Sequence, residues 1–340
     1  MSPSPQRPTS PPTERLSPEE CVAALRTRVD EALPTLVEER TPAALYDAVE
    51  HVLRSKGKRI RPVLLLLVAQ SYGASADRAL PAALAVEVFH NFTLVHDDLM
   101  DKDEERRGYP TVHVKWDPGT AVLVGDLMMG LSYDLLGQVE GANVEALYSV
   151  YNPMVEKLCA GQALDASFET EASVSVDAYL DMIDRKTGAL LSAAFELGGV
   201  IGGASMADRD HLREAGQLVG RAFQIQDDLL DLTANNEAWG RGVGGDLVQG
   251  KKTFLTLRAL ERAEGADYDW FSRLVTDVGL PRDEVPEARD RMASLGIFEE
   301  AREAVMSYTE QAHDWLQTLP NTAAAETLHW LLDHLQGRDY

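Results

Sequence analysis

Two acidic motifs of nearly the same sequence stand far apart in this 340-residue chain. The first reads DDLMD and the second DDLLD, and together they supply Asp97, Asp98, Asp101, Asp227, Asp228 and Asp231. Each motif closes a long apolar segment with helical periodicity, so its first and last aspartates lie about one turn apart on the same helix face. The sequence therefore predicts a pair of carboxylates near the end of each of two helices.

Carboxylates at this spacing repel one another, and keeping them charged in a partly dry cleft is costly unless cations compensate. Mg²⁺ is a suitable cation, because it binds oxygen ligands, retains several waters and is usually held by one or two carboxylates together with substrate phosphates. The two motifs therefore predict a diphosphate that is held through metal ions between two acidic helix ends.

Basic residues precede a predicted helix in the segment GKRIRP. Lys58 and Arg61 are three positions apart and can share one face of that helix. Cations oppose the helix dipole at an N-terminus, whereas the backbone N–H groups there favour anions. This conflict favours an anion-binding site over the alternative, a solvated basic surface.

Two adjacent arginines, Arg106 and Arg107, follow the first acidic motif in KDEERRGYPTVH. The Gly-x-Pro turn after them would fold the chain back, and their planar guanidinium groups match phosphate oxygens. The alternative is that they pair with the neighbouring acids on the surface. Their position beside DDLMD favours phosphate binding.

Two further segments combine glycine with residues that bind phosphate. In RKTG, a glycine inside a helix would cost roughly 1 kcal/mol, which predicts a break or close approach that brings Lys186 and Thr187 into the same cleft. A polar helix patch is the alternative. The glycine-rich segment 240–253 contains Lys251 but lacks P-loop spacing. We interpret it as a lid over bound phosphates rather than a flexible connection.

Apolar residues recur at three- and four-residue intervals along most of the chain, and no segment shows convincing strand alternation. The predicted helices are 19–36, 42–55, 60–73, 79–101, 117–138, 142–170, 176–204, 207–232, 252–264, 284–292, 297–318 and 322–336. The central helices are apolar most of the way round, as expected when neighbouring helices surround them. The predicted fold class is all-α.

Residues 1–17 are rich in Pro and Ser and lack apolar periodicity, so we expect a disordered tail. Ser17 followed by Pro18 and two acids is typical of a helix N-terminus. No linker divides residues 18–340, and an apolar content of 45% suffices for a substantial core. We therefore expect a single domain after the tail.

The net charge of −23 argues against nucleic acid as a partner, because binding phosphate backbones requires a basic surface. A salt-rich cytoplasm is one interpretation of the acidity. Cys21 and Cys159 are too few for a disulfide framework or a thiolate metal site. The longest apolar stretch is shorter than a membrane span, and the N-terminus lacks a signal core. We expect a cytoplasmic protein with no membrane span.

Taken together, GKRIRP, DDLMDKDEERRG, RKTG, FQIQDDLLD and GGDLVQGKKT resemble the ordered motifs of the trans-isoprenyl diphosphate synthases, the polyprenyl synthetase family. The resemblance covers residues 57–253. It implies an isoprenoid-synthase fold, with helices around a central cavity, in a protein that is usually a homodimer. It also implies that the six aspartates of the two acidic motifs bind Mg²⁺.

The resemblance further implies two sets of substrate-binding residues. The allylic diphosphate would be held by Arg106, Lys186, Thr187, Gln224 and Lys251. Isopentenyl diphosphate would be held by Lys58, Arg61, His90 and Arg107. Arg241 stands where the family more often has lysine; it keeps the charge, but its planar fork has a different geometry.

In the family, three Mg ions and the cationic side chains stabilise the departing diphosphate and leave an allylic carbocation, which isopentenyl diphosphate attacks. The resemblance therefore implies catalytic roles for Asp97, Asp98, Asp101, Lys186, Asp227 and Asp228. The released diphosphate would remove the proton, and an apolar cavity would keep water from the cation.

Product length should depend on the residues that precede DDLMD. Phe92 lies about 7.5 Å and Phe89 about 12 Å down the helix axis from Asp97. In the family, an aromatic residue at the position of Phe92 resembles the floor of short-chain enzymes, and Thr93 beside it is small. The motif HNFTLVHDDLMD is most similar to the geranylgeranyl type. We expect a C20 product, with C15 as the alternative; both phenylalanines could instead be core residues.

Three other interpretations compete with a synthase. A class I terpene cyclase normally carries an Asn/Ser/Glu metal motif in place of DDLLD and has no use for a second cationic cluster. A non-catalytic partner subunit tends to lose aspartates, and all six are present. A helical structural protein with cation-binding surface acids would leave the paired cationic motifs unexplained.

Overall fold

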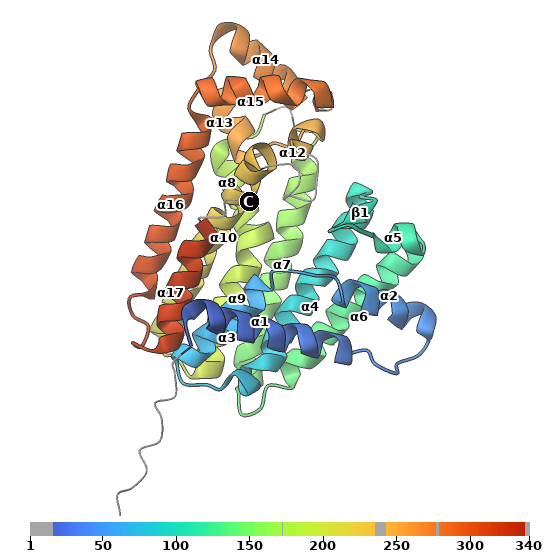
Figure 1. Cartoon of the computed structure of the whole chain (residues 1–340), viewed down its shortest axis with the longest axis vertical. Coiled ribbons are helices and arrows are strands. Elements are labelled where there is room, and N and C mark those ends of the chain that lie inside the picture. Colours follow the sequence, from blue (N-terminus) through green and yellow to red (C-terminus); the bar gives the residue numbers. More distant parts are fainter. Residues whose placement is uncertain (1–15, 172, 235–242, 277–278, 337–340) are drawn as a thin grey trace, which may run out of the picture.

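The computed structural model describes residues 16–171, 173–234, 243–276 and 279–336, and it confirms the all-α fold (Figure 1). The first half of the described chain contains α1 (Pro18–Thr35), α2 (Ala43–Leu53), α3 (Ile60–Ser71), α4 (Ala76–Asp101), α5 (Val112–Lys115), α6 (Pro118–Gly137) and α7 (Val144–Phe168). The second half contains α8 (Val176–Ile183), α9 (Ala189–Gly202), α10 (Met206–Thr233), α12 (Gly245–Val248), α13 (Phe254–Arg262), α14 (Gly265–Thr276), α15 (Val285–Ser294), α16 (Ile297–Leu316) and α17 (Ala323–Gln336).

Helix α1 begins at the predicted cap. The Ser17 hydroxyl accepts a hydrogen bond from the Glu20 N–H at 3.2 Å, and the Glu20 carboxylate accepts one from the Ser17 N–H at 2.8 Å. This reciprocal pair satisfies two N–H groups that the helix itself cannot. Residues 1–15 of the expected tail lie outside the described residues, and its disorder and the single domain after it stay predictions.

Two clusters of buried apolar side chains fill the interior. The larger lies among α1–α4, α6, α7, α9 and α17, and its centre includes the run Val63–Ala69, where every side chain is buried. The smaller lies among α8 and α12–α16. Of these, α12–α15 gather at one end of the molecule in Figure 1, and α16 extends from that end along the side. Helices α10 and α16 contribute to both clusters. Leu212, in the first half of α10, belongs to the larger cluster, and Leu232, near its end, belongs to the smaller cluster.

The structure departs from the predicted helices in three places. A short antiparallel hairpin, β1 (Glu105–Arg106) and β2 (Tyr109–Pro110), occupies a segment for which only a turn was expected. The predicted helix 176–204 is interrupted by η1 (Asp184–Gly188), one turn of π-helix, as the internal glycine indicated. Helices α5, α12 and α14 and the 3₁₀ turn η2 (Arg282–Glu284) were not predicted.

One of the described helices, α6, is long and apolar enough to cross a membrane by length and composition, and 44% of its 18-residue window is buried inside the protein. Its buried residues, which include Val124 and Met128, belong to the larger core cluster, and α6 packs along α4. A core helix of this composition passes the same test, so the observation is weak support for a span.

Candidate active site

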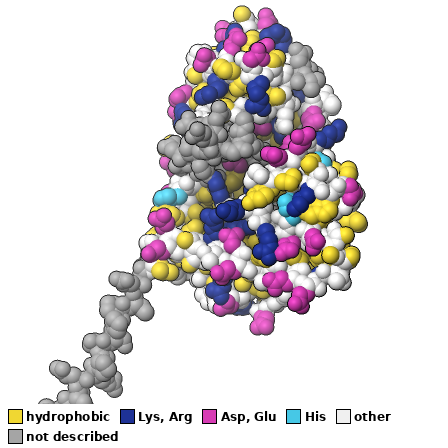
Figure 2. All heavy atoms as spheres, turned by 45° about the vertical axis from the view of Figure 1, so that its right-hand side comes forward, with side chains coloured by type: hydrophobic (Ala, Val, Ile, Leu, Met, Phe, Trp, Pro, Cys, Tyr) yellow, Lys and Arg dark blue, Asp and Glu magenta, His cyan; other side chains and the backbone are white. Residues whose placement is uncertain are grey.

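Two adjoining cavities lie between the long helices. The basic cavity, about 580 Å³, is lined by Lys58, Arg61, His90, Arg106 and Arg107 among others. The acidic cavity, about 260 Å³, is lined by Asp101, Asp165, Glu169, Asp228 and Asp246 together with Lys251. The two cavities share four lining residues, Gln162, Lys186, Thr187 and Gln224. Figure 2 shows basic side chains grouped beside a hollow in this face of the molecule.

Each cavity is lined by one aspartate from each acidic motif. Asp97 and Asp227 line the basic cavity, and Asp101 and Asp228 line the acidic cavity. The first member of each pair comes from the C-terminal end of α4, and the second comes from that of α10. The two motifs therefore face adjoining cavities from two helices. In the first motif the first and last aspartates line the cavities, as the spacing predicted, whereas in the second motif Asp227 and Asp228 do so and Asp231 does not. Within the described residues, no group of three or more His, Cys, Asp or Glu residues is close enough to form a ready-made metal site.

The remaining two aspartates line neither cavity and make contacts within the protein. Asp98 is buried and accepts a hydrogen bond from Nε of Arg106 at 2.5 Å. The carboxylate of Asp231 accepts the N–H of Asp246 at 3.2 Å, and its backbone carbonyl accepts the N–H of Gly244 at 2.8 Å. In this structure Asp231 thus holds the start of α12 against the end of α10.

Burial and mutual repulsion make the acidic motifs receptive to positive charge. Burial, followed by the nearby Asp101 carboxylate, raises the pKa of Asp97 despite the opposing charge of Lys186. Burial and then Asp246 raise the pKa of Asp228 to about 7, although Asp228 accepts hydrogen bonds from the Tyr179 hydroxyl and from the N–H of Phe254 at 3.2 Å. A bound divalent cation would offset the cost of keeping these buried carboxylates charged, so that they would not need to be protonated.

The π-turn η1 directs two predicted substrate-binding residues into the shared wall. Lys186 donates to Oδ2 of Asp165 at 2.5 Å, and Thr187 donates to Oε1 of Gln224 at 2.9 Å. Gln224 in turn donates through Nε2 to Oδ1 of Asp228 at 3.1 Å. A continuous hydrogen-bonded chain therefore links the π-turn to the second acidic motif.

Glycines make the π-turn possible. A Cβ on Gly161 of α7 would lie 2.4 Å from the backbone N of Lys186. A Cβ on Gly220 of α10 would lie 2.5 Å from Cα of Gly188. The turn is therefore held between two helices at backbone distance, which is the close approach that the glycine in RKTG predicted.

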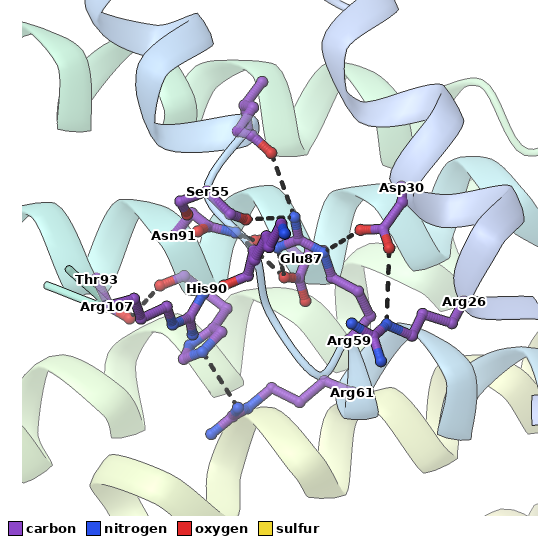
Figure 3. Close-up of polar contacts among 12 residues, drawn as sticks. Arg26, Asp30, Ser55, Arg59, Arg61, Glu87, His90, Asn91, Thr93 and Arg107 are labelled. Carbon is purple, nitrogen blue, oxygen red and sulfur yellow. Dashed lines mark hydrogen bonds and ion pairs between the residues drawn. The ribbon is translucent and has the colours of Figure 1, made fainter. Parts of the chain in front are cut away.

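The basic cavity contains the four residues predicted for isopentenyl diphosphate. Nη1 of Arg61 lies 3.2 Å from Nε2 of His90, and the Arg61 guanidinium lies 5.6 Å from the ring centroid of Phe223. Arg107 is at the turn of the hairpin with φ of +55° and donates to the carbonyl of Lys56 at 3.0 Å. Figure 3 shows Arg61 pointing toward His90, with Arg107 beside it. Helices α3 and α4 and the hairpin thus contribute to one cationic wall.

The segment after α10 contributes lysines to the acidic cavity. Nζ of Lys251 lies 3.9 Å from a carboxylate oxygen of Asp101, so this loop approaches the first acidic motif. The next residue, Lys252, is buried and donates to the carbonyl of Phe168 at the end of α7. Arg241 lies outside the described residues, and the lid interpretation of 240–253 stays a prediction.

The three predicted chain-length residues are in different surroundings. Thr93 lines the basic cavity together with Leu94, whereas neither Phe89 nor Phe92 is among the residues that line the two cavities. The Phe89 ring centroid is 5.1 Å from that of Phe92 and 5.6 Å from that of Tyr151 on α7. The phenylalanines therefore form part of an aromatic layer between α4, α6 and α7, next to the wall that Thr93 lines.

Sequence reasoning missed several residues of the site. Gln162 of α7 lines both cavities and Asp165 of α7 lines the acidic cavity. Oε1 of Gln162 is buried without a hydrogen-bond partner among the described residues. Both residues follow Gly161 within about one turn, but α7 also carries other polar and charged residues, so the sequence did not single them out. Tyr179, whose hydroxyl bonds Asp228, had no sequence signal, because its partner is on a different helix.

A family model described as "Polyprenyl synthetase" matches residues 42–290. The geranylgeranyl diphosphate synthase of Methanosarcina mazei is 37% identical over 92% of this chain and 96% of its own length. The geranylfarnesyl diphosphate synthase of Natronomonas pharaonis is 36% identical over 95% of this chain and 98% of its own. The crystal structure of geranylgeranyl pyrophosphate synthetase from Pyrococcus horikoshii superimposes with a TM-score of 0.87 at 35% identity, covering 94% of this chain and 99% of that one.

Proposed function

Because the chain belongs to the polyprenyl synthetase family, we propose that it is a short-chain trans-prenyltransferase that condenses isopentenyl diphosphate head-to-tail with allylic diphosphates. The observation that carries this proposal is the pair of adjoining cavities, one basic and one acidic, with an aspartate of each motif in each. Two diphosphates could therefore bind side by side, one of them through metal ions and the other through lysine and arginine side chains without metal. A terpene cyclase, which binds a single diphosphate, has no use for the second site.

The donor set in and beside the acidic cavity fits Mg²⁺. It consists of carboxylate oxygens, which this cation prefers, and Asp98, Asp228 and Asp231 are buried. We propose that Asp97, Asp101, Asp227 and Asp228, with Asp98 and Asp231 after rearrangement, hold three Mg ions with the allylic diphosphate. When bound, these ions would neutralise the charge that builds on the departing diphosphate.

The side chains of this chain supply the rest of the chemistry. Arg106, Lys186 and Lys251 would hold the allylic diphosphate and stabilise its negative charge as the carbon–oxygen bond breaks. Thr187 and Gln224, which bond each other, would orient the group at the boundary between the cavities. Lys58, Arg61, His90 and Arg107 would hold isopentenyl diphosphate so that its double bond faces the allylic carbon. The released diphosphate would take the proton.

The proposed product is geranylgeranyl diphosphate, C20, with farnesyl diphosphate, C15, as the alternative. The name of the Methanosarcina mazei relative supports C20, and the name of the Natronomonas pharaonis relative extends the range to be assayed to C25. We also propose a homodimer, supported by exposed apolar side chains on α6 that include Val122, Leu123 and Met129. A cytoplasmic location stays a prediction.

The test is an incubation of the purified protein with Mg²⁺, isopentenyl diphosphate and, in turn, dimethylallyl, geranyl and farnesyl diphosphates. Mass analysis of the dephosphorylated products should show a C20 alcohol from all three starters. Accumulation at C15 or C25 would correct the product length and leave the activity standing. An absence of condensation with every starter would contradict the proposed function.

A further inference from the structure

The segment Lys56–Arg61, which joins the loop after α2 to the first residues of α3, carries an arginine whose side chain is buried. Lys58, Arg59 and Arg61 all line the basic cavity, and Arg59 has φ of +50°, in the left-handed region. The Arg59 side chain is only 2% exposed. An arginine in this backbone conformation and at this depth needs compensating contacts.

Those contacts come from three different helices. Nε of Arg59 donates to Asp30 of α1 at 2.7 Å, and Nη1 donates to Glu87 of α4 at 2.6 Å. Nη2 donates to the carbonyl of Ser55 at 2.8 Å and to that of Leu53, at the end of α2, at 3.3 Å. Figure 3 shows this guanidinium among Asp30, Glu87 and Ser55.

The two carboxylates are themselves held in place. Asp30 lies 3.6 Å from Nε of Arg26 one turn earlier on α1. Glu87 is buried and accepts a second hydrogen bond from Nδ2 of Asn91 at 3.3 Å. The positions of both partners are therefore determined by the helices rather than by the loop.

The opposite side of the loop is also held. Arg107 donates to the carbonyl of Lys56, and a Cβ on Gly57 would lie 2.9 Å from Nη1 of Arg107 and 3.0 Å from Nη1 of Arg59. The loop therefore passes between two guanidinium groups, and both arginines line the basic cavity, although the Arg59 side chain is buried.

We propose that Arg59 is a positioning residue, which anchors this loop to α1, α2 and α4 and thereby fixes the spacing at which Lys58 and Arg61 meet isopentenyl diphosphate. This inference rests on the proposed function. The donors of Arg59 are directed to protein acceptors, so it acts through its two neighbours rather than on the diphosphate. A lysine could keep the charge but could not contact both carboxylates and both carbonyls with one group.

The experiment compares Arg59→Gln and Arg59→Lys with the unmodified protein. Isopentenyl diphosphate has no reaction partner when it is present alone, so its Kd can be measured by calorimetry, and both KM values can be measured in the full assay. We expect Arg59→Gln to raise the Kd and the KM for isopentenyl diphosphate by about tenfold or more, while the KM for the allylic diphosphate changes by less than about twofold. For Arg59→Lys, the Kd and the KM for isopentenyl diphosphate should lie between those of Arg59→Gln and those of the unmodified protein.

A double-mutant cycle separates positioning from direct contact. In a Lys58→Ala/Arg61→Ala background, Arg59→Gln should weaken isopentenyl diphosphate binding by less than about twofold further, because the groups that it positions are gone. The control is Arg209→Gln, which breaks an ion pair with Glu196 that is 2.9 Å long and largely buried. Neither residue of this pair lines either cavity. This control should lower the melting temperature and leave both KM values unchanged.

An additive loss in the double-mutant background would show direct contact with the diphosphate and overturn the inference. An equal rise in both KM values would show a general structural role and overturn it as well. If Arg59→Gln does not fold, Asp30→Asn can be used instead, because it removes only one partner of Arg59. It should also raise the KM for isopentenyl diphosphate selectively, but by a smaller factor. Failure of the proposed function would be seen earlier, as an absence of condensation by the unmodified protein.

Discussion

Nη1 of Arg61 lies 3.2 Å from Nε2 of His90, and in this contact the arginine is the donor. A guanidinium has no acceptor, so Nε2 of His90 carries no proton and the proton of the neutral ring is on Nδ1. Burial, followed by the charges of Arg61 and Arg107, lowers the pKa of His90 well below its ordinary value of 6.5. The cationic wall therefore contains a neutral imidazole, which accepts from one of its arginines.

This arrangement predicts a loss of stability in acid. Between the lowered pKa of folded His90 and the ordinary value of 6.5, the unfolded chain binds a proton that the folded chain does not, so the free energy of unfolding falls as the pH falls. At pH about 5.5 the contribution is on the order of 1 kcal/mol. Urea unfolding should show a fall in the free energy of unfolding between pH 7.5 and pH 5.5. We expect this fall to be smaller by about that amount in His90→Gln than in the unmodified protein. Identical pH profiles would contradict a neutral His90.

Gly161 sets the contact between α7 and the π-turn. Gly161→Ala would place a methyl group 2.4 Å from the backbone N of Lys186, so we expect a destabilisation of about 1–3 kcal/mol from overpacking, with a fall in kcat as Lys186 moves. Ala163→Ser, at an exposed position of the same helix, is the control and should change stability by less than about 0.5 kcal/mol. Normal stability of Gly161→Ala would mean that the π-turn is not packed as described.

The acidic motifs should make activity dependent on Mg²⁺. Chelation should abolish condensation, and added Mg²⁺ should restore it. Asp97→Asn or Asp227→Asn should each lower kcat by about 10²–10³-fold, because each removes a group that supports charge stabilisation as the diphosphate leaves. Glu303→Gln, an exposed acid on α16, should leave kcat unchanged. Full activity after chelation would exclude a metal-dependent mechanism.

The aromatic layer beside Thr93 should limit the product. Phe92→Ala would open space next to the cavity wall, and we expect a longer product, whereas Thr93→Phe would fill the cavity itself and shorten the product. Mass analysis of the alcohols measures both changes. Phe298→Ala, a buried aromatic in the smaller core cluster, should lower stability without altering product length. An unchanged profile in Phe92→Ala would remove that residue as a floor.

The exposed apolar face of α6 should form the homodimer contact. Leu123 is 57% exposed, and Leu123→Glu would place a charge in a contact between two copies. Light scattering should show a dimer for the unmodified protein and a monomer for the variant. Met306→Glu changes a similarly exposed residue, 53%, on α16 and should leave the dimer intact. A monomeric unmodified protein would reject the homodimer.

Much of the architecture follows from local pattern. The capping signal at Ser17, the helical periodicity and the spacing of Asp97 and Asp101 depend only on residues within a few positions of one another, and the structure agrees with each. The sequence also predicts an irregularity at the π-turn, because a glycine inside a helix is unfavourable unless another group approaches it closely. Ordered motifs were sufficient to recognise the family.

The tertiary structure alone decided which members of each motif face the cavities. In the second motif Asp227 and Asp228 line the cavities and Asp231 contacts the start of α12, although the spacing favours Asp227 with Asp231. Similarly, GKRIRP contains three cations, and only packing against Asp30 and Glu87 shows that Arg59 is anchored in the protein. Periodicity identifies the face on which a side chain lies, but the partner on that face comes from another helix. That pairing depends on how segments distant in the sequence pack against one another, and local sequence patterns do not predict it.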